Sequence, residues 1–231
     1  MQPSKPIIHC VDWQTIDYPA AWNRQEQLFA EKLQQKASGL LPDNDFILCQ
    51  HLPVYTLGRH GHASNMLLSE EQLANVGAAL LRVDRGGDIT FHGPGQWTGY
   101  PIMDLEQFHI GLKNYIFLLE QLIINVLAVY GIRGERLQGA TGVWIEPHTA
   151  QARKICAIGV RASRFVTMHG FALNVNTNLA WFSYINPCGF TDKTVTSMQK
   201  ELSRQIDMDE VRDVLFREAR SCFSEPMKYI K

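Results

Sequence analysis

The sequence predicts a single domain over residues 1–231, of the mixed α/β class, with an α+β arrangement on a mixed sheet. Its 231 residues, 45% of them hydrophobic, are enough to bury the core of one large domain. Stretches of helical pattern are mixed with groups of short β-rich runs that do not alternate with them one by one, which favours a mixed sheet. No internal repeat or low-complexity linker divides the chain, although the pattern leaves room for a small carboxy-terminal part after about Asp192.

The first part of the chain predicts a helix that lies on strands. In Tyr18–Lys36 apolar side chains recur at helical spacing, so we expect a helix with one face on a sheet. Asp45–Gln50 and Val54–Leu57 have the composition of strands. The run Ser69-Glu70-Glu71-Gln72 has the spacing of a capping box, which predicts a short helix that ends near Gly77.

The second part predicts a buried helix, three strands and a last helix. Ile110–Tyr130 is apolar at helical spacing and is expected to be central and largely buried. Three short β-rich runs follow, broken by Gly, Pro and Asn: Val143–Glu146, Lys154–Arg161 and Phe171–Val175. Acidic residues from Asp207 cap a final amphipathic helix that runs through Cys222.

Charge and composition exclude several classes of protein. The formal net charge is −1, from 22 basic and 23 acidic residues, so no global field attracts nucleic acid or an anionic membrane. No apolar stretch of signal-peptide length begins the chain, and Glu120 interrupts the most hydrophobic run, Tyr115–Tyr130. We therefore expect a cytoplasmic protein. Its five scattered cysteines fit neither a disulfide framework nor a paired zinc motif, so reduced thiols are expected.

The segment Arg85–Gln96 is the most informative part of the sequence. It combines four glycines with Arg, Thr, His and Gln side chains and follows the expected strand Leu80–Val83. Glycine lets the backbone approach a ligand that a side chain would exclude, and Pro94 fixes the chain between two of the glycines. A hairpin that only turns the chain explains the glycines but not the polar residues among them. The segment is interpreted as a binding loop held by a strand.

Three further segments carry polar residues in unusual settings. Lys154 begins a strand whose alternation places it on one face with Cys156 and Ile158. Thr167–Asn176 again sets small residues between polar ones. In Ile185–Gly189, Cys188 stands between a proline and a glycine, a setting that presents a side chain to a cleft.

Each of these residues also has a purely structural interpretation. A lone cysteine is usually a small buried hydrophobe, which is the preferred interpretation of the other four cysteines: Cys10, Cys49, Cys156 and Cys222. A lone strand-end lysine is most often a solvated charge. A zinc site from Cys156, His169 and Cys188 lacks any recognised ligand spacing, so no metal is expected.

Four ordered blocks of this sequence resemble the octanoyltransferases of lipoate biosynthesis, also called lipoyl(octanoyl) transferases or lipoate-protein ligase B. The blocks are Arg-Gly-Gly-x-x-Thr-aromatic-His-Gly-Pro-Gly-Gln at Arg85–Gln96, Lys-x-x-Ala-x-Gly at Lys154–Gly159, His-Gly-Phe-Ala-x-Asn at His169–Asn174 and Pro-Cys-Gly at Pro187–Gly189. The resemblance implies a fold similar to the catalytic domain of biotin and lipoate protein ligases. Cys156, close to the lysine, is the one departure from the family pattern.

The resemblance also implies an activity, partners and a site. An octanoyl or lipoyl group would pass from octanoyl-acyl carrier protein, through a cysteine thioester, to a lysine of lipoyl domains of 2-oxoacid dehydrogenases or the glycine cleavage H protein. Cys188 and Lys154 would form the catalytic pair, without a cofactor. The implied substrate-binding residues are Arg85, Gly86, Gly87, Asp88, Ile89, Thr90, Phe91, His92, Ala157, Ile158, Gly159, Gly170, Phe171 and Ala172.

The residues themselves fit this chemistry. A nearby ammonium favours the thiolate form of a cysteine, and a thioester donor needs no ATP. Two other functions stay open: an ATP-dependent lipoate or biotin ligase, although no Walker pattern is present, and a non-catalytic module that binds lipoyl domains or acyl carriers. Four arginines are candidates for docking acidic partner proteins: Arg59, Arg153, Arg161 and Arg164.

Overall fold

A computed structural model of the protein describes residues 6–186 and 194–224. Within these ranges, strands in the order β1-β2-β6-β10-β9-β8-β7, with β11 beside β9, form one sheet, and β4-β3-β5 form a second, smaller one. The strands of the large sheet are β1 (Ile8–Thr15), β2 (Asn44–Gln50), β6 (Gln96–Ile102), β7 (Glu135–Leu137), β8 (Ala140–Ile145), β9 (Arg153–Ser163), β10 (Val166–Asn174) and β11 (Thr194–Val195). Those of the small sheet are β3 (Val54–Leu57), β4 (Ala79–Arg82) and β5 (Ile89–His92).

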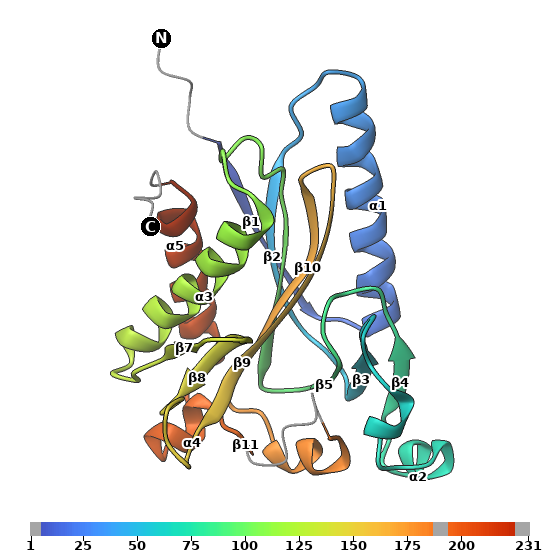
Figure 1. The fold of residues 1–231 in the computed structure, drawn as a ribbon, viewed down its shortest axis with the longest axis vertical. Coiled ribbons are helices and arrows are strands. Elements are labelled where there is room, and N and C mark those ends of the chain that lie inside the picture. Colours follow the sequence, from blue (N-terminus) through green and yellow to red (C-terminus); the bar gives the residue numbers. More distant parts are fainter. Residues whose placement is uncertain (1–5, 187–193, 225–231) are drawn as a thin grey trace.

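Helices cover both faces of the large sheet (Figure 1). Helix α1 packs on β10 and β6 from one side, whereas α3 and α5 pack on each other and on the sheet from the opposite side. The helices are α1 (Tyr18–Ala37), α2 (Glu70–Asn75), α3 (Leu112–Val129), α4 (Met198–Leu202) and α5 (Met208–Ser224), with short 3₁₀ turns η1 (Ala63–Asn65) and η2 (Leu179–Tyr184). The predicted mixed α/β class is therefore confirmed.

Helix α3 owes its place to its composition. It is long and apolar enough to span a membrane by length and hydropathy, yet residues such as Leu119, Leu122 and Ile123 are fully buried against the sheet and α5. The side chains Leu215 and Ala219 of α5 belong to the same buried cluster. The described residues after Asp192 thus share the main hydrophobic core.

Most predicted helices and strands are present, but the sequence pattern missed β1, β6, β7, β11 and α4. Strand β6 is fully buried although it contains Gly99 and Pro101, residues that argue against a central strand. A Cβ atom at Gly99 would lie 2.2 Å from the ring of Phe171, so this strand needs glycine where β10 crosses it. The Arg85–Gln96 segment, interpreted as a loop, contains strand β5, because Ile89 and Phe91 are buried in the small sheet.

Candidate active site

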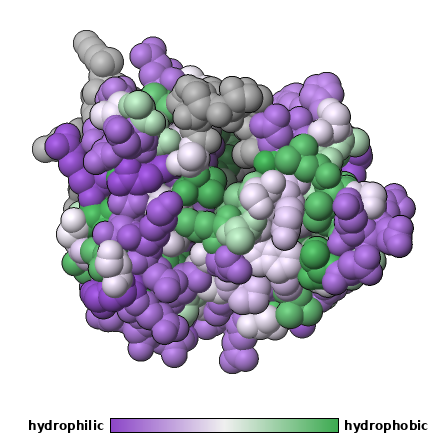
Figure 2. Space-filling view, turned by 90° about the horizontal axis from the view of Figure 1, so that it is seen from below, coloured by the Kyte–Doolittle hydropathy of each residue, from purple (hydrophilic) through white to green (hydrophobic). Residues whose placement is uncertain are grey.

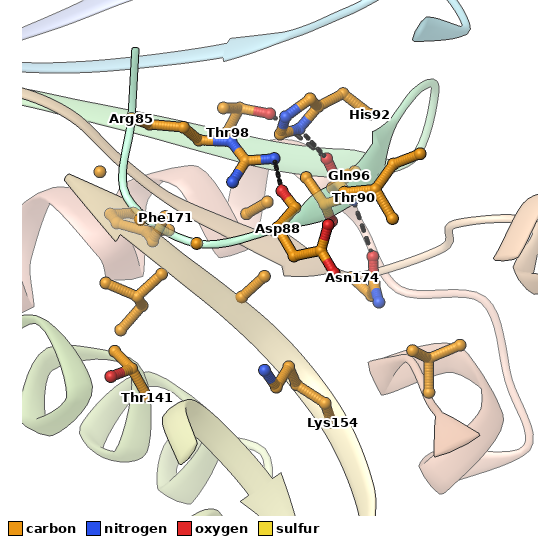
Figure 3. A pocket seen from close by; sticks show the side chains of 18 of the residues that line it. Arg85, Asp88, Thr90, His92, Gln96, Thr98, Thr141, Lys154, Phe171 and Asn174 are labelled. Atoms are coloured by element: carbon orange, nitrogen blue, oxygen red, sulfur yellow. Dashed lines mark hydrogen bonds between the residues drawn. The ribbon is translucent and has the colours of Figure 1, made fainter. Parts of the chain in front are cut away.

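A cavity of about 360 Å³ lies between the two sheets, a volume within the range of about 300–1,000 Å³ that is typical of small-molecule sites. Strands β9 and β10 form one wall, and the Arg85–His92 segment lies across from them (Figure 3). Beyond the residues that the sequence predicted, the cavity is lined by Tyr18, Gln96, Thr98, Tyr100, Gly139, Ala140, Thr141, Trp144, His169, Asn174, Phe182, Thr194 and Val195.

The structure brings nearly all the predicted site residues to this one cavity. Lys154 and every predicted substrate-binding residue except Gly86 and Phe91 line it. The N–H of Gly86 donates to the carbonyl of Val160, at 3.0 Å, and so ties the loop to β9. Phe91 lies in the buried cluster of the small sheet, where its ring stacks on Trp181 at 5.2 Å between centroids. These two residues therefore shape the cavity from behind.

Glycine is required where the Arg85 loop meets β9. A Cβ atom at Gly159 would lie 2.6 Å from the carbonyl oxygen of Gly86, closer than real Cβ atoms come to any neighbour. In β10, Gly170 is the cross-strand partner of Gly159. This pair leaves the cavity wall bare of side chains at that level.

Arg85 shapes the loop from inside. Its side chain is 8% exposed and donates to the backbone carbonyls of Thr56 and Asp88, both at 2.7 Å, and of Gly86 at 2.9 Å. Each bond is charge-assisted, so the guanidinium ties the backbone at Gly86 and Asp88 to Thr56 of β3. Arg85 is thus a structural cation at the cavity wall.

Lys154 reaches the cavity because β9 is bulged. Val143 and Trp144 of β8 pair with Cys156 and Lys154, so Ile155 is an extra residue between two paired positions. Such a bulge turns side chains to new directions. Ile155 and Cys156 are both fully buried, and Lys154 shares the cavity with Ala157 and Gly159. Strict alternation, which placed Lys154 and Cys156 on the same face, fails at this bulge.

A chain of buried polar side chains closes the side of the cavity opposite Lys154 (Figure 3). His92 Nδ1 lies 2.9 Å from Gln96 Oε1, and Gln96 Nε2 donates to Asn174 Oδ1 at 2.9 Å. Burial holds the pKa of His92 well below its ordinary value, and the neighbouring charge of Arg85 acts in the same direction. His92 is therefore neutral near pH 7.

Two further buried histidines, His51 and His169, each form a hydrogen bond beside the cavity. His51 Nε2 lies 2.7 Å from the hydroxyl of Tyr100, and burial lowers the pKa of His51 to about 4. His169, which has a positive φ of 59°, places Nε2 2.7 Å from a carboxylate oxygen of Asp84, which also pairs with Arg161. The hydrogen bond from His169, together with the charge of Arg161, keeps the pKa of Asp84 below its usual value. Asp84 is ionised and anchors a neutral imidazole.

The described cysteines are unsuited to nucleophilic attack. Cys156 and Cys49 are 0% exposed, and burial raises the pKa of both thiols. Cys10 and Cys222 are half-buried between elements of the core. Cys188, the expected nucleophile, lies outside the described residues. Among residues 6–186 and 194–224, no cluster of His, Cys, Asp and Glu is arranged to hold a metal ion.

Two of the four arginines expected to dock partners are engaged within the molecule. Arg153 pairs with Glu146 and Glu201, both at 2.7 Å. Arg161 pairs with Asp84 and Glu26. Arg59 and Arg164 are exposed, and Arg59 belongs to the loop whose backbone joins the Arg85 segment at the cavity. Arg59 thus lies exposed beside the segment that lines the cavity.

The end of the molecule that lies lowest in Figure 1 carries an apolar area. Seen from that end, hydrophobic and neutral side chains gather near the centre of the surface, inside a margin of hydrophilic ones (Figure 2). Phe182 of η2 lines the cavity, and the neighbouring aromatic side chains Trp181 and Tyr184 are half-buried. Aromatic side chains of η2 thus lie at the cavity and beside it.

Comparison with known proteins gives close matches. Residues 17–220 match the family model of the lipoyl protein ligase A/B catalytic domain. An octanoyltransferase of Bacteroides fragilis (strain YCH46) is 58% identical over 207 residues, which cover 90% of this chain and 94% of the relative. An octanoyltransferase of Bacteroides thetaiotaomicron is 54% identical over 220 residues, 95% of this chain and 97% of the relative.

Among solved structures, the fold resembles a bipartite lipoate protein ligase from Thermoplasma acidophilum, described with its E2 lipoyl domain. The TM-score is 0.70 at 14% identity, and the match covers 94% of this chain and 84% of the other. At that identity the likeness concerns the fold alone, and it confirms the expected similarity to lipoate protein ligases.

Proposed function

Because the chain belongs to the lipoyl protein ligase A/B catalytic-domain family, we propose that it is an octanoyltransferase, like its relatives at 54–58% identity. Its donor would be an octanoyl thioester on acyl carrier protein. Its acceptor would be a lysine of a lipoyl domain, in 2-oxoacid dehydrogenases or the glycine cleavage H protein. We expect the reaction to take place in the cytoplasm.

One observation carries the proposal beyond the family: Lys154 lines a cavity in which part of one wall is made of residues with small side chains. Ala157, Gly159, Gly170 and Ala172 form a smooth wall beyond the lysine. An acyl chain of eight carbons could lie along it. Burial is worth about 0.8 kcal/mol per methylene, so such a chain gains roughly 4–6 kcal/mol.

The chain on both sides of Cys188 also supports a role near Lys154. Val195 of β11 is the register partner of Lys154, and the N–H of Thr196 donates to the Lys154 carbonyl at 2.9 Å. On the other side, the N–H of Asn186 donates to Asn65, whose side chain donates to Asp88 of the cavity wall. The described residues that flank 187–193 are thus attached at the cavity.

The proposed reaction has two acyl transfers. The thiolate of Cys188 attacks the carbonyl carbon of the donor thioester, the bond to the carrier sulfur breaks, and the carrier thiolate takes a proton from the Lys154 ammonium. The amine of the acceptor lysine then attacks the new thioester. Neutral Lys154 accepts the amine proton as the amide forms, and Cys188 leaves as thiolate.

Buried Cys156 does not compete for this role. It faces the hydrophobic core on the far side of the bulge, and burial favours its neutral thiol. An attacking sulfur needs thiolate character and access to the substrate. Neither condition holds at Cys156.

The proposal is tested with octanoyl carrier protein and a lipoyl domain, in the absence of ATP. We expect intact mass spectrometry to detect an octanoyl adduct on the enzyme before the lipoyl domain is added, and on the lipoyl domain afterwards. Modification that requires free octanoate and ATP would instead identify a ligase. Binding of the lipoyl domain without either adduct would identify a non-catalytic module.

A bulkier side chain on the cavity wall should shorten the acyl chain that is accepted. Gly159 is a poor choice because any Cβ meets the Gly86 carbonyl, whereas Ala157 lines the cavity and is half-exposed. For Ala157→Leu we expect the rate ratio of hexanoyl to octanoyl donors to rise about ten-fold, since overpacking costs roughly 1–3 kcal/mol. The control is Ala162→Leu, at an exposed position of the same strand. An unchanged ratio in the folded Ala157 variant would remove this wall from the acyl site.

A further inference from the structure

Trp144 is among the largest buried side chains of the described residues, yet it stands outside their hydrophobic clusters. It is 2% exposed, and the five clusters of buried apolar residues that the described chain forms do not include it. Its indole N–H donates to the carbonyl of Ala140 at 2.9 Å. The ring therefore has a fixed orientation, and the main core does not explain its position.

The ring contacts Lys154. The two residues are cross-strand partners in β8 and β9, and Lys154 Nζ lies 4.6 Å from the centroid of the Trp144 ring. An ammonium within about 6 Å of an indole centroid is attracted by the negative face of the ring, and the attraction is stronger at desolvated sites. Without this contact, a lysine next to a bulge would keep many rotamers, since its stem has four rotatable bonds.

The backbone of β8 is shaped so that the lysine can lie against the tryptophan. Gly142 has a φ of 119°, and a Cβ there would lie 2.5 Å from the carbonyl oxygen of Cys156 and 3.5 Å from Lys154 Cε. The N–H of Gly142 donates at 3.1 Å to buried Glu120 of α3, which also pairs with Arg136. Glu120 thus holds the β8 backbone close beneath the lysine stem.

We propose that Trp144 is a positioning residue for the transfer reaction, which directs the Lys154 amine into the cavity and stabilises its protonated form through the ring face. This rests on the proposed role of Lys154. Among residues 6–186 and 194–224, the other ionisable groups of the cavity and its floor are Tyr18, Arg85, Asp88, His92, Tyr100, His169, Glu120 and Cys156. They remain in place when the ring is changed, so a change at Lys154 can be assigned to the ring.

The test measures Lys154 directly. Wild type and Trp144→Leu are labelled with acetic anhydride over a pH series, and acetylation of Lys154 is quantified by peptide mass spectrometry. We expect the midpoint of the Lys154 labelling curve to fall by about 0.5–1 pH unit in Trp144→Leu, because loss of the ring removes the stabilisation of the ammonium. The kcat for transfer should fall about ten-fold or more while KM for the octanoyl donor changes less. Trp144→Phe, which keeps an aromatic face, should restore most of both values.

The matched control is Trp97→Leu. Trp97 is also 2% exposed and also donates its indole N–H to a carbonyl, that of Met208 at 2.9 Å, but it belongs to the hydrophobic core. The Trp97→Leu variant should be less stable than wild type, but its labelling curve of Lys154 should not move. The proposal is overturned if the curve is unchanged in Trp144→Leu, or moves as far in Trp97→Leu.

If Trp144→Leu does not fold, fluorinated tryptophan incorporated in its place supplies the same test, because it weakens the ring face with little change in shape. The labelling midpoint of Lys154 should fall when Trp144 is fluorinated. It should not fall in Trp144→Phe whose other tryptophans are fluorinated. No difference between these two proteins would also overturn the proposal. Activity of Lys154→Met separates this outcome from failure of the proposed function: an active variant removes the role of Lys154, whereas an inactive one leaves only Trp144 in question.

Discussion

Cys188→Ala is expected to lose octanoyl transfer by at least about 10³-fold and to form no octanoyl adduct. The variant removes the only sulfur of the enzyme that the proposed mechanism uses, and loss of a nucleophile typically removes nearly all of the rate of a covalent reaction. The measurement is intact mass after mixing with octanoyl carrier protein, followed by transfer to a lipoyl domain.

Cys156→Ala is the matched control. Cys156 is two residues from Lys154 but 0% exposed in the main core, so substantial activity should remain. Ala in place of a small buried thiol costs some stability, which a thermal melt records. If Cys156→Ala were inactive and folded while Cys188→Ala still formed the adduct, the nucleophile would be Cys156 and the proposed mechanism would be wrong.

The sequence predicted the helices well because their signals are local. Apolar spacing in α1 and α3 and the capping box of α2 depend on residues within a few turns of each other. Strand β6 could not be predicted in this way. Gly99 of this strand is required by the ring of Phe171 on β10, and these two residues are far apart in the chain.

The site was predicted where residues act through composition and missed where they act through register. The glycine-rich and small-residue segments predicted a binding site, and most of their residues line the cavity. Trp144 reaches Lys154 only because a bulge brings the two into a cross-strand pair, and Tyr18 lines the cavity from the first turn of a helix. Gln96 and Asn174 are the last residues of two of the sequence motifs. The hydrogen bond between their side chains joins separate strands, so it could not be predicted from either motif.

The bulge at Ile155 illustrates the limit of predicting strand faces from sequence alternation. One additional residue in β9 moves every side chain on one side of it to the other face. No residue in Lys154–Arg161 signals the bulge, because it arises from the pairing of β8 with β9. Alternation therefore predicted the wrong companions for Lys154, although it was right to place a lysine at the start of a strand.

Lys154→Met is expected to slow transfer by roughly 10²–10⁴-fold, the range that a positioned acid or base contributes. Methionine keeps most of the volume beside Trp144 and Gly142 and removes the charge and the proton-accepting nitrogen. Both half-reactions should suffer. The first loses the ammonium that favours the thiolate, and the second loses the acceptor for the amine proton.

These two effects can be separated. Alkylation of Cys188 by iodoacetamide, followed by peptide mass spectrometry across a pH series, reports thiolate formation alone, and its profile should move to higher pH in Lys154→Met. Lys200→Met, at an exposed position of α4, is the control for loss of one lysine and should leave the profile in place. Should the alkylation profile of folded Lys154→Met coincide with that of wild type while transfer is still lost, Lys154 would act only as the acceptor of the amine proton. If transfer also persisted, Lys154 would have no part in the reaction, since no stage of the chemistry would then depend on its charge or its nitrogen.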